Sequence, residues 1–79
     1  MFAAETQTVL VFKTNIHNEY EKTYVQALMN SVYGIHDCTV DINDIDKVLR
    51  VETDEEGIDD KYVIDKINSY GFMCKSLED

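Results

Sequence analysis

The stretch TVLVFKTNI at residues 8–16, continued by HNEYEKTYVQALMNSVYGI at residues 17–35, decides the fold of this 79-residue chain. Its first part is rich in β-branched and aromatic residues, which predicts a strand. Because side chains alternate along a strand, four of them share one face: Leu10, Phe12, Thr14 and Ile16. We expect this face to contribute to a core.

A helix is predicted between Asn18 and Gly34. Asn18 stands three residues before Glu21, the spacing in which a cap side chain and a carboxylate satisfy each other's free backbone N–H groups. Behind this capping box, apolar residues recur at helical spacing: Tyr24, Val25, Leu28, Met29 and Val32. Gln26 is expected on the solvent side. Gly34 can adopt the left-handed conformation that ends a helix, and Ile35 can then fold back onto the last turn.

The middle of the chain predicts a hairpin. Residues 38–42 alternate between apolar and polar side chains, which is typical of a half-buried strand. Residues 43–47 form the predicted turn. Residues 48–53 predict the return strand, with Leu49 and Val51 facing the core.

A second helix is expected after the acidic residues 54–57. Asp59 is its predicted N-cap, since a carboxylate there can accept from the free N–H groups of the first turn. Gly71 is predicted to end this helix in the left-handed conformation. Residues 72–77 then predict a last short strand.

The element order βαββαβ leaves one compact architecture for a chain of this length. Two βαβ units with right-handed crossovers give the split βαβ, or ferredoxin-like, α+β sandwich. We expect a four-stranded antiparallel sheet in the order 4-1-3-2, with both helices on one face. One domain should span residues 1–79, with its structured part at about residues 8–78. Three turns should meet at one end: residues 16–18, 43–47 and 70–72.

The composition limits the classes of partner. Sixteen acidic residues against seven basic ones give a net charge of -9, which repels phosphate backbones and anionic lipid headgroups. Nucleic acid and membrane surfaces are therefore not expected as partners. The sequence has no apolar run of about 18 residues and no basic leader at its start, so we expect a cytoplasmic protein.

The two cysteines, Cys38 and Cys74, are too few for a disulfide scaffold, and their spacing matches no zinc knuckle. In the predicted topology, Cys38 starts one edge strand and Cys74 lies on the opposite edge, beyond bonding distance. The neighbouring sequence supplies no cations that would lower the pKa of either thiol. We predict that both are buried as small hydrophobic side chains.

Several of these features together resemble a known family. The run Phe12-Lys13-Thr14-Asn15-Ile16, the Gly34-Ile35 and Gly71-Phe72 helix ends and the Val48-Leu49-Arg50-Val51 strand are similar to heavy-metal-associated domains. That family includes copper chaperones and soluble domains of metal-transporting ATPases. The resemblance implies the ferredoxin-like fold, and because it rests on hydrophobic spacing and turn glycines it specifies fold much more than activity.

The resemblance ends at the metal site of the family. Its members hold a soft ion with Cys-x-x-Cys where the first strand meets the first helix, and an ungapped alignment puts Asn18 and Glu21 at those positions. Cu(I) needs sulfur ligands, and an amide oxygen with a carboxylate binds it far more weakly. We interpret the two residues as a helix cap worth on the order of 1 kcal/mol. No cofactor is expected.

His17 supports an alternative interpretation. It lies in the same loop as Glu19 and Glu21, and a histidine with one or two carboxylates can recruit Zn, Ni or Cu(II) weakly. The simpler interpretation is an exposed loop histidine. His36 should lie at the far end of the domain, where it cannot complete such a site.

Two acidic stretches are candidate binding surfaces. The first lacks the glycine and the bidentate glutamate of a calcium loop and predicts a solvated turn: Asp41, Asn43, Asp44 and Asp46. The second is either a solvated surface or a docking face for a basic partner: Glu52, Asp54, Glu55, Glu56, Asp59 and Asp60.

The sheet face opposite the helices is the last candidate surface. It should expose a set of apolar side chains: Val9, Val11, Val48, Met73 and Leu77. A monomer rarely leaves a contiguous apolar patch open, and two strand edges are also unpaired. Homodimerisation or docking of a partner strand is one interpretation, and scattered surface apolar residues are the other.

The sequence therefore predicts a noncatalytic interaction module of heavy-metal-associated fold whose thiolate site is degenerate. It would act through protein–protein contacts, with a basic partner or a second copy. The alternative is a metallochaperone-like protein that binds a metal ion through His17 and nearby carboxylates. An enzyme is not expected, because the sequence has no glycine-rich phosphate loop and no Ser/His/Asp order.

Overall fold

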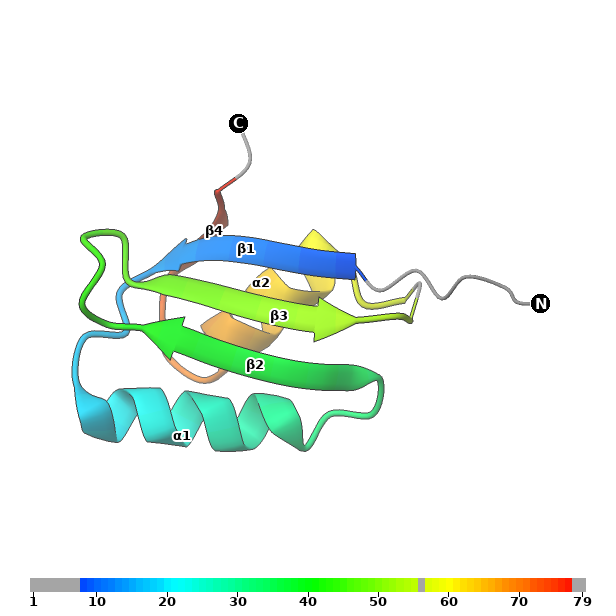
Figure 1. Ribbon diagram of the computed structural model, residues 1–79, viewed down its shortest axis with the longest axis horizontal. Helices are drawn as coiled ribbons and strands as arrows, with labels where there is room; N and C mark the ends of the chain where they lie inside the picture. The colour runs from blue at the N-terminus through cyan, green and yellow to red at the C-terminus, as the bar shows by residue number, and fades with distance from the viewer. Residues whose placement is uncertain (1–7, 56, 78–79) are drawn as a thin grey trace.

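The computed structural model describes residues 8–55 and 57–77, so Glu56 of the acidic run and the ends of the chain lie outside the described residues. Six elements follow one another in the predicted order: β1 (Thr8–Thr14), α1 (Glu19–Asn30), β2 (Ile35–Asp41), β3 (Val48–Thr53), α2 (Asp60–Ser69) and β4 (Cys74–Ser76). The βαββαβ fold class is confirmed (Figure 1).

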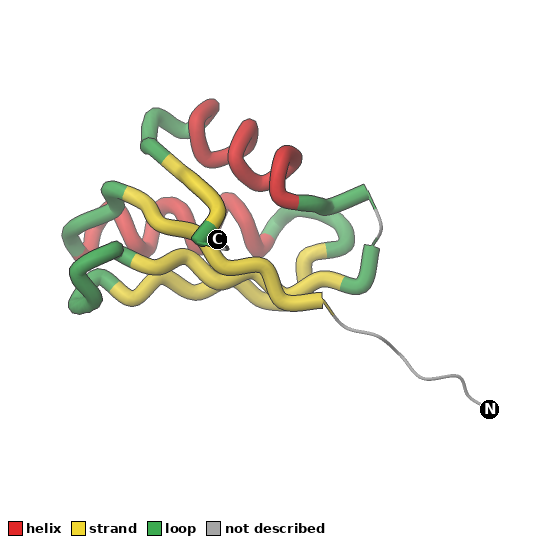
Figure 2. Tube along the Cα trace, turned by 90° about the horizontal axis from the view of Figure 1, so that it is seen from above, coloured by secondary structure: helices red, strands yellow, loops and turns green. Residues whose placement is uncertain are grey.

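The four strands form one antiparallel sheet in the order β2-β3-β1-β4, which is the predicted order read from the other edge. The register pairs Leu10 with Val51 and Phe12 with Leu49, so that buried side chains of the two central strands lie side by side. Both helices lie on one side of the sheet (Figure 2), and the strands stand in front of α2 in Figure 1.

The core fills the space between the sheet and the helices. Its fully buried large side chains come from both layers: Phe12, Ile16, Val25, Met29, Leu49, Val51, Val63 and Ile67. Two predictions about α1 were wrong. Tyr24 is 46% exposed, and the buried residues of this helix are Val25 and Met29. Gln26 is half-buried, and its Oε1 accepts the Val40 N–H at 2.9 Å, which ties α1 to the edge strand β2.

Strand β1 ends at Thr14, two residues before the predicted end. The hydroxyl of Thr14 donates to the Lys47 carbonyl at 2.6 Å and accepts the Ile16 N–H at 3.2 Å. This side chain therefore takes over hydrogen bonding where the chain leaves the strand. Ile16 remains fully buried, as its predicted face requires.

The passage from α1 to β2 differs most from the expectation. The helix ends at Asn30 rather than Gly34, and β2 begins at Ile35 rather than Cys38. Gly34 does have a positive φ of 94°, but Ile35 starts the strand instead of folding back onto the helix. A bulge between Ile35 and Asp37 allows both Ile35 and Cys38 to face the core.

Helix α2 ends as its glycine predicts. Gly71 has a φ of 100°, the Phe72 N–H donates to the Ile67 carbonyl at 3.2 Å, and the Gly71 N–H donates to the Asn68 carbonyl at 3.0 Å. These two bonds are those of a Schellman motif. The last strand is shorter than predicted, beginning at Cys74 rather than Phe72.

The cysteines are both buried and unpaired, Cys38 at 1% exposure and Cys74 at 7%. Cys38 lies in the middle of β2 rather than at its start, and Cys74 begins β4. Their strands form opposite edges of the sheet, as the topology predicted. Within residues 8–55 and 57–77, neither helix is long and apolar enough to cross a bilayer.

Candidate functional site

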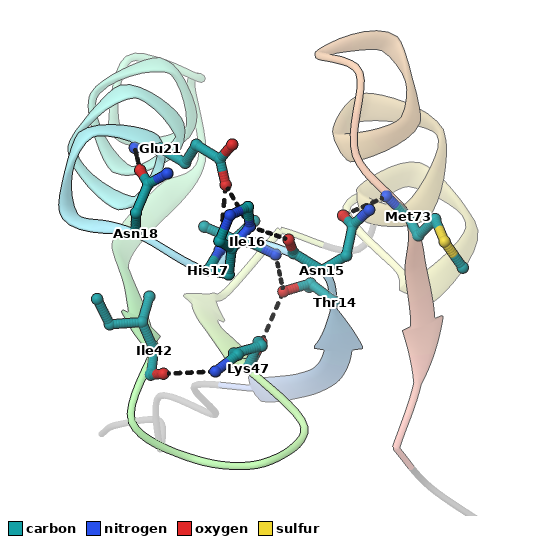
Figure 3. A network of polar contacts seen from close by, with 9 residues as sticks. All are labelled: Thr14, Asn15, Ile16, His17, Asn18, Glu21, Ile42, Lys47 and Met73. Carbon is teal, nitrogen blue, oxygen red and sulfur yellow. Dashed lines mark hydrogen bonds and ion pairs between the residues drawn. The ribbon is translucent and has the colours of Figure 1, made fainter.

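Three turns meet at one end of the sheet, around the loop between β1 and α1. Thr14 bonds the turn that precedes β3 through the Lys47 carbonyl, and the Asn15 Oδ1 accepts the Met73 N–H at 2.9 Å, 58 residues along the chain. The Lys47 Nζ in turn donates to the Ile42 carbonyl at 2.9 Å. Figure 3 shows this network, which fixes the β1–α1 loop from both sides.

Asn18 is the N-cap of α1. Its backbone is extended, with φ -136° and ψ 169°, and its Oδ1 accepts the Glu21 N–H at 2.8 Å. The Asn18 carbonyl accepts the first helical bond, from the Lys22 N–H at 2.9 Å. An acceptor at this position satisfies one of the N–H groups that a helix leaves free at its start.

The Glu21 carboxylate completes the start of the helix in a way the sequence did not predict. A capping box would return this carboxylate to the Asn18 N–H, but its Oε1 accepts the His17 N–H instead, at 3.1 Å. The same Oε1 lies 3.1 Å from the His17 Nδ1 (Figure 3). One carboxylate oxygen therefore holds both the backbone and the ring of His17.

The candidate metal ligands come together only in part. His17 and Glu21 are in contact, whereas Glu19 has no contact with either that would complete a ligand set. Across residues 8–55 and 57–77, no three His, Cys, Asp or Glu side chains are grouped so as to hold an ion. His36 lies where β2 begins and pairs with Asp54 at 3.0 Å, away from the β1–α1 loop.

The carboxylates of the turn before β3 bond to the turn itself. The Asp41 Oδ1 accepts the Asn43 N–H at 3.0 Å, and the Asp44 Oδ1 accepts the Asp46 N–H at 2.8 Å. Asp46 also lies 3.7 Å from the Lys13 Nζ. These side chains shape the turn as Asx motifs, as expected for a solvated turn rather than a calcium loop.

Neither cysteine offers a thiolate to a ligand. Burial, reinforced by the Asp37 charge, raises the pKa of the Cys38 thiol to about 12. Burial, reinforced by the Asp60 charge, raises the pKa of the Cys74 thiol to about 12 as well. The thiolate is the form that binds metals and attacks electrophiles, so both side chains remain inert thiols at neutral pH.

Sequence reasoning did not identify Thr14, Asn15 and Gln26 as organising residues. Each forms a side-chain bond to backbone that is distant in sequence, respectively to Lys47, Met73 and Val40. Thr14 and Asn15 stand at the end of β1, where Thr and Asn side chains often form hydrogen bonds with nearby backbone groups. Their partners, however, depend on the three-dimensional arrangement of the turns.

The sheet face opposite the helices, called the open face below, consists of the outward-pointing strand positions and two flanking residues. Its members are Val9, Val11, Lys13, Asp37, Thr39, Asp41, Val48, Arg50, Glu52, Met73, Lys75 and Leu77. Met73 is 62% exposed and Val9 43%, while Val11, Val48 and Leu77 are half-buried. Figure 1 looks onto this face, and no helix crosses it.

Three solved structures share this arrangement. The CsoZ metallochaperone is 17% identical, with a TM-score of 0.74 over 89% of this chain and 99% of that one. Oxidized MerP from Ralstonia metallidurans CH34 is 9% identical, with a TM-score of 0.78 over 92% and 100%. A structure concerned with crosstalk between Cu(I) and Zn(II) homeostasis is 13% identical, with a TM-score of 0.76 over 89% and 99%.

At the level of sequence, no protein-family model and no curated protein matches the chain. The likeness to the solved structures therefore rests on the path of the backbone, and at these identities it establishes the fold alone. The chain shares the βαββαβ fold of these three structures.

Proposed function

We propose that this chain is a noncatalytic interaction module that keeps the heavy-metal-associated fold without its soft-metal site. One observation carries the proposal. At the two positions that an ungapped alignment puts at the sulfur ligands of the family, the Asn18 Oδ1 accepts the Glu21 N–H and the Glu21 Oε1 accepts the His17 N–H, as a helix start. Oxygen and nitrogen ligands of this kind give Cu(I) little affinity.

The cysteines do not substitute for the missing ligands. Cys38 and Cys74 belong to opposite edge strands, both are buried, and both have a pKa near 12. A metal site requires deprotonated thiols that converge on one ion. The chain would need to unfold in part before these sulfurs could take up a metal.

The surface hollow along α2 gives no support to catalysis. It is lined by side chains of one helix: Tyr62, Asp65, Lys66 and Ser69. The Lys66 Nζ lies 5.8 Å from the centre of the Tyr62 ring, a cation–π distance that accounts for its position. Substrate sites are usually enclosed between several elements, whereas this hollow is open and lies along a single helix.

Protein–protein contact is then the role that the surface supports. The net charge of -9 favours a basic partner over an acidic one, and the acidic run after β3 places Asp54, Glu55 and Asp59 in solvent. The open face offers a second surface with exposed apolar side chains. A basic protein and a second copy of the chain are the two partners that these surfaces suit.

A second function has one observation in its favour. The His17 ring and the Glu21 carboxylate lie 3.1 Å apart at an exposed loop, and such a pair can bind Zn, Ni or Cu(II) weakly. Only one of the two candidate glutamates takes part, so we expect affinity no better than micromolar. A metallochaperone role would need tighter binding than this pair provides.

The experiment that separates the two functions is a titration with Cu(I), Zn and Ni, followed by NMR. The proposal predicts no submicromolar binding and, at most, weak shifts at His17 with Zn or Ni that disappear in H17Q. Submicromolar binding of any of the three ions, with shifts centred on the β1–α1 loop, would contradict the proposal. The matched control is H36Q, which removes the exposed histidine outside that loop.

A further inference from the structure

The open face is electrically neutral in a strongly acidic chain. Its acidic side chains are Asp37, Asp41 and Glu52, and its basic side chains are Lys13, Arg50 and Lys75, three of each sign. The chain as a whole has a net charge of -9. Two copies can therefore approach through this face with less repulsion than through the rest of the surface, while a basic partner would be attracted elsewhere.

The charges on the open face are also segregated. The register places Asp37 opposite Glu52 on the β2 side and Lys13 opposite Lys75 on the β4 side. Like charges directly opposite one another destabilise a sheet, so the pair of Lys13 and Lys75 favours an external negative charge. Lys13 has a partial counter-charge in Asp46 at 3.7 Å, and Lys75 lies beside it in solvent.

We propose that the open face binds a second copy of this chain, related by a two-fold axis that runs parallel to the strands. This inference rests on the proposed function and names the partner for one of its two surfaces. The axis places the β2 side of each copy over the β4 side of the other. The acidic β2 side of each copy then faces the basic β4 side of the other, and two-fold symmetry repeats this contact twice.

One row of the sheet makes the contact specific. Asp41 pairs with Val48, and Lys13 pairs with Lys75. Because Phe12 pairs with Leu49, the next residues along, Lys13 and Val48, are also neighbours, and the four residues form one row across the sheet. Under the proposed axis, Asp41 of one copy faces Lys75 of the other at both ends of this row. In the next row Val11 faces Arg50 of the other copy, so that its apolar surface meets an arginine stem.

The other two-fold arrangements are less favourable. An axis perpendicular to the strands but parallel to the sheet would place the acidic β2 of one copy over the acidic β2 of the other. Pairing through the β2 edge is opposed by α1, whose Gln26 already bonds the outward Val40 N–H. Pairing through the β4 edge would involve a strand of only three residues.

A charge-exchange experiment tests the arrangement. D41K and K75D each place like charges in both symmetric contacts, so each variant alone should raise the dimer Kd by about tenfold or more. An equal mixture of the two should form heterodimers, because each contact then joins opposite charges again. Light scattering should show dimer mass in the mixture, and monomer mass in either variant alone at the same total concentration.

Matched variants separate charge from folding. D41N retains an acceptor for the Asn43 N–H and removes only the charge, so it should weaken the dimer less than D41K. K61D and D65K make the same changes in an exposed ion pair on α2, where the atoms lie 3.2 Å apart, and should leave the dimer Kd unchanged alone or mixed. Thermal unfolding of each variant verifies that it is folded.

NMR dilution of the wild-type protein locates the interface. The account predicts concentration-dependent shifts at Val11, Thr39 and Arg50, in the centre of the open face. Three results would overturn it: a wild-type protein that stays monomeric at millimolar concentration, shifts confined to the β4 edge, or a mixture of D41K and K75D no heavier than either alone.

The result is independent of the metal titration. Asp41 and Lys75 supply no atom to the cap formed by Asn18 and Glu21. A monomeric protein that binds no Cu(I) would overturn the second-copy interface and leave the proposed function with its basic partner. Tight Cu(I) binding at the β1–α1 loop would overturn the proposed function whatever the oligomeric state.

Discussion

The two halves of the chain, β1-α1-β2 and β3-α2-β4, each form a strand–helix–strand unit, and they differ in the loop that leads into the helix. Each helix begins with an Asx residue whose side chain accepts the backbone N–H three residues on, at 2.8 Å for Asn18 and 3.0 Å for Asp59. Each half has a glycine at positive φ before its last strand, 94° at Gly34 and 100° at Gly71. The second half thus serves as an internal reference for the first.

The difference lies in the loop that enters each helix. At α2 the third helical residue is Tyr62, which contributes only its N–H, whereas at α1 it is Glu21, which also reaches back to His17. The β1–α1 loop is further tied to two distant turns by Thr14 and Asn15. The β1–α1 loop, to which the ungapped alignment assigns the sulfur ligands of the resembling family, therefore has the hydrogen bonds of an ordinary helix start, with additional bonds to two distant turns.

The largest expected effect comes from restoring the sulfurs in the first half. N18C/E21C should bind Cu(I) at least a hundredfold more tightly than the wild-type protein, because two thiolates at a helix N-terminus suit a soft ion. Competition with a chromogenic Cu(I) chelator under reducing conditions measures the gain.

The control for this gain is N18S/E21Q, which keeps the capping atoms and offers no thiolate. It should bind Cu(I) no better than the wild-type protein. If the double-cysteine protein also failed to bind Cu(I), then Asn18 and Glu21 would not occupy the ligand positions of the family, and the alignment would be wrong.

The two glycines should differ next. A Cβ at Gly34 would lie 2.5 Å from the Glu55 Cγ and 3.0 Å from the Ile58 Cδ1, whereas a Cβ at Gly71 would meet nothing within 4 Å. G71A should cost about 1–2 kcal/mol for its left-handed backbone, and G34A about 2–4 kcal/mol because overpacking is added. Urea unfolding of both variants measures the difference, and equal losses would show that the first half tolerates the overlap.

The two caps should have similar, smaller effects. N18A and D59A should each lower the free energy of unfolding by about 0.5–2 kcal/mol, since each removes the acceptor for a helix N–H. N18S and D59S, which retain an acceptor, should recover most of the loss. An N18A protein as stable as the wild type, beside a destabilised D59A, would mean that the cap of α1 adds no stability.

The cysteines affect the pH dependence of stability, and this effect is absent at neutral pH. Burial keeps each thiol protonated to about pH 12, whereas an unfolded thiol loses its proton near pH 9. The folded state therefore binds more protons between pH 9 and 12, and stability falls as the pH rises through that window. C38A and C74A should each flatten this decline, and a wild-type decline no steeper than that of the variants would contradict the assigned burial.

Regular patterning explains why so much of the fold could be predicted from the sequence. The alternation around Phe12 and Leu49 and the Asx residues at positions 18 and 59 act locally, and each determines its element without reference to the rest of the chain. Gly71 is a similar case, since a Schellman motif needs only the helix it closes.

The failures of prediction occurred where distant parts of the chain compete. Gly34 was predicted to end α1, but α1 ends at Asn30 and β2 starts at Ile35, with Glu55 and Ile58 lying close to Gly34. Tyr24 fitted the apolar stripe by spacing, yet only Val25 and Met29 are buried in the helix. The contact between Glu21 and the His17 N–H likewise depends on the path by which the loop enters the helix.

The central claim is that Asn18 and Glu21 start a helix where the resembling family binds a soft metal, and one measurement tests it most directly. The free energy of unfolding of the wild-type protein is measured in urea with and without Cu(I), under anaerobic reducing conditions. A native metal site would stabilise the folded state, by about 2.7 kcal/mol when Cu(I) is at 100 times its Kd. The account predicts no increase, and a small decrease if Cu(I) binds the thiols exposed on unfolding. An increase of that size, lost in N18A/E21A, would contradict it.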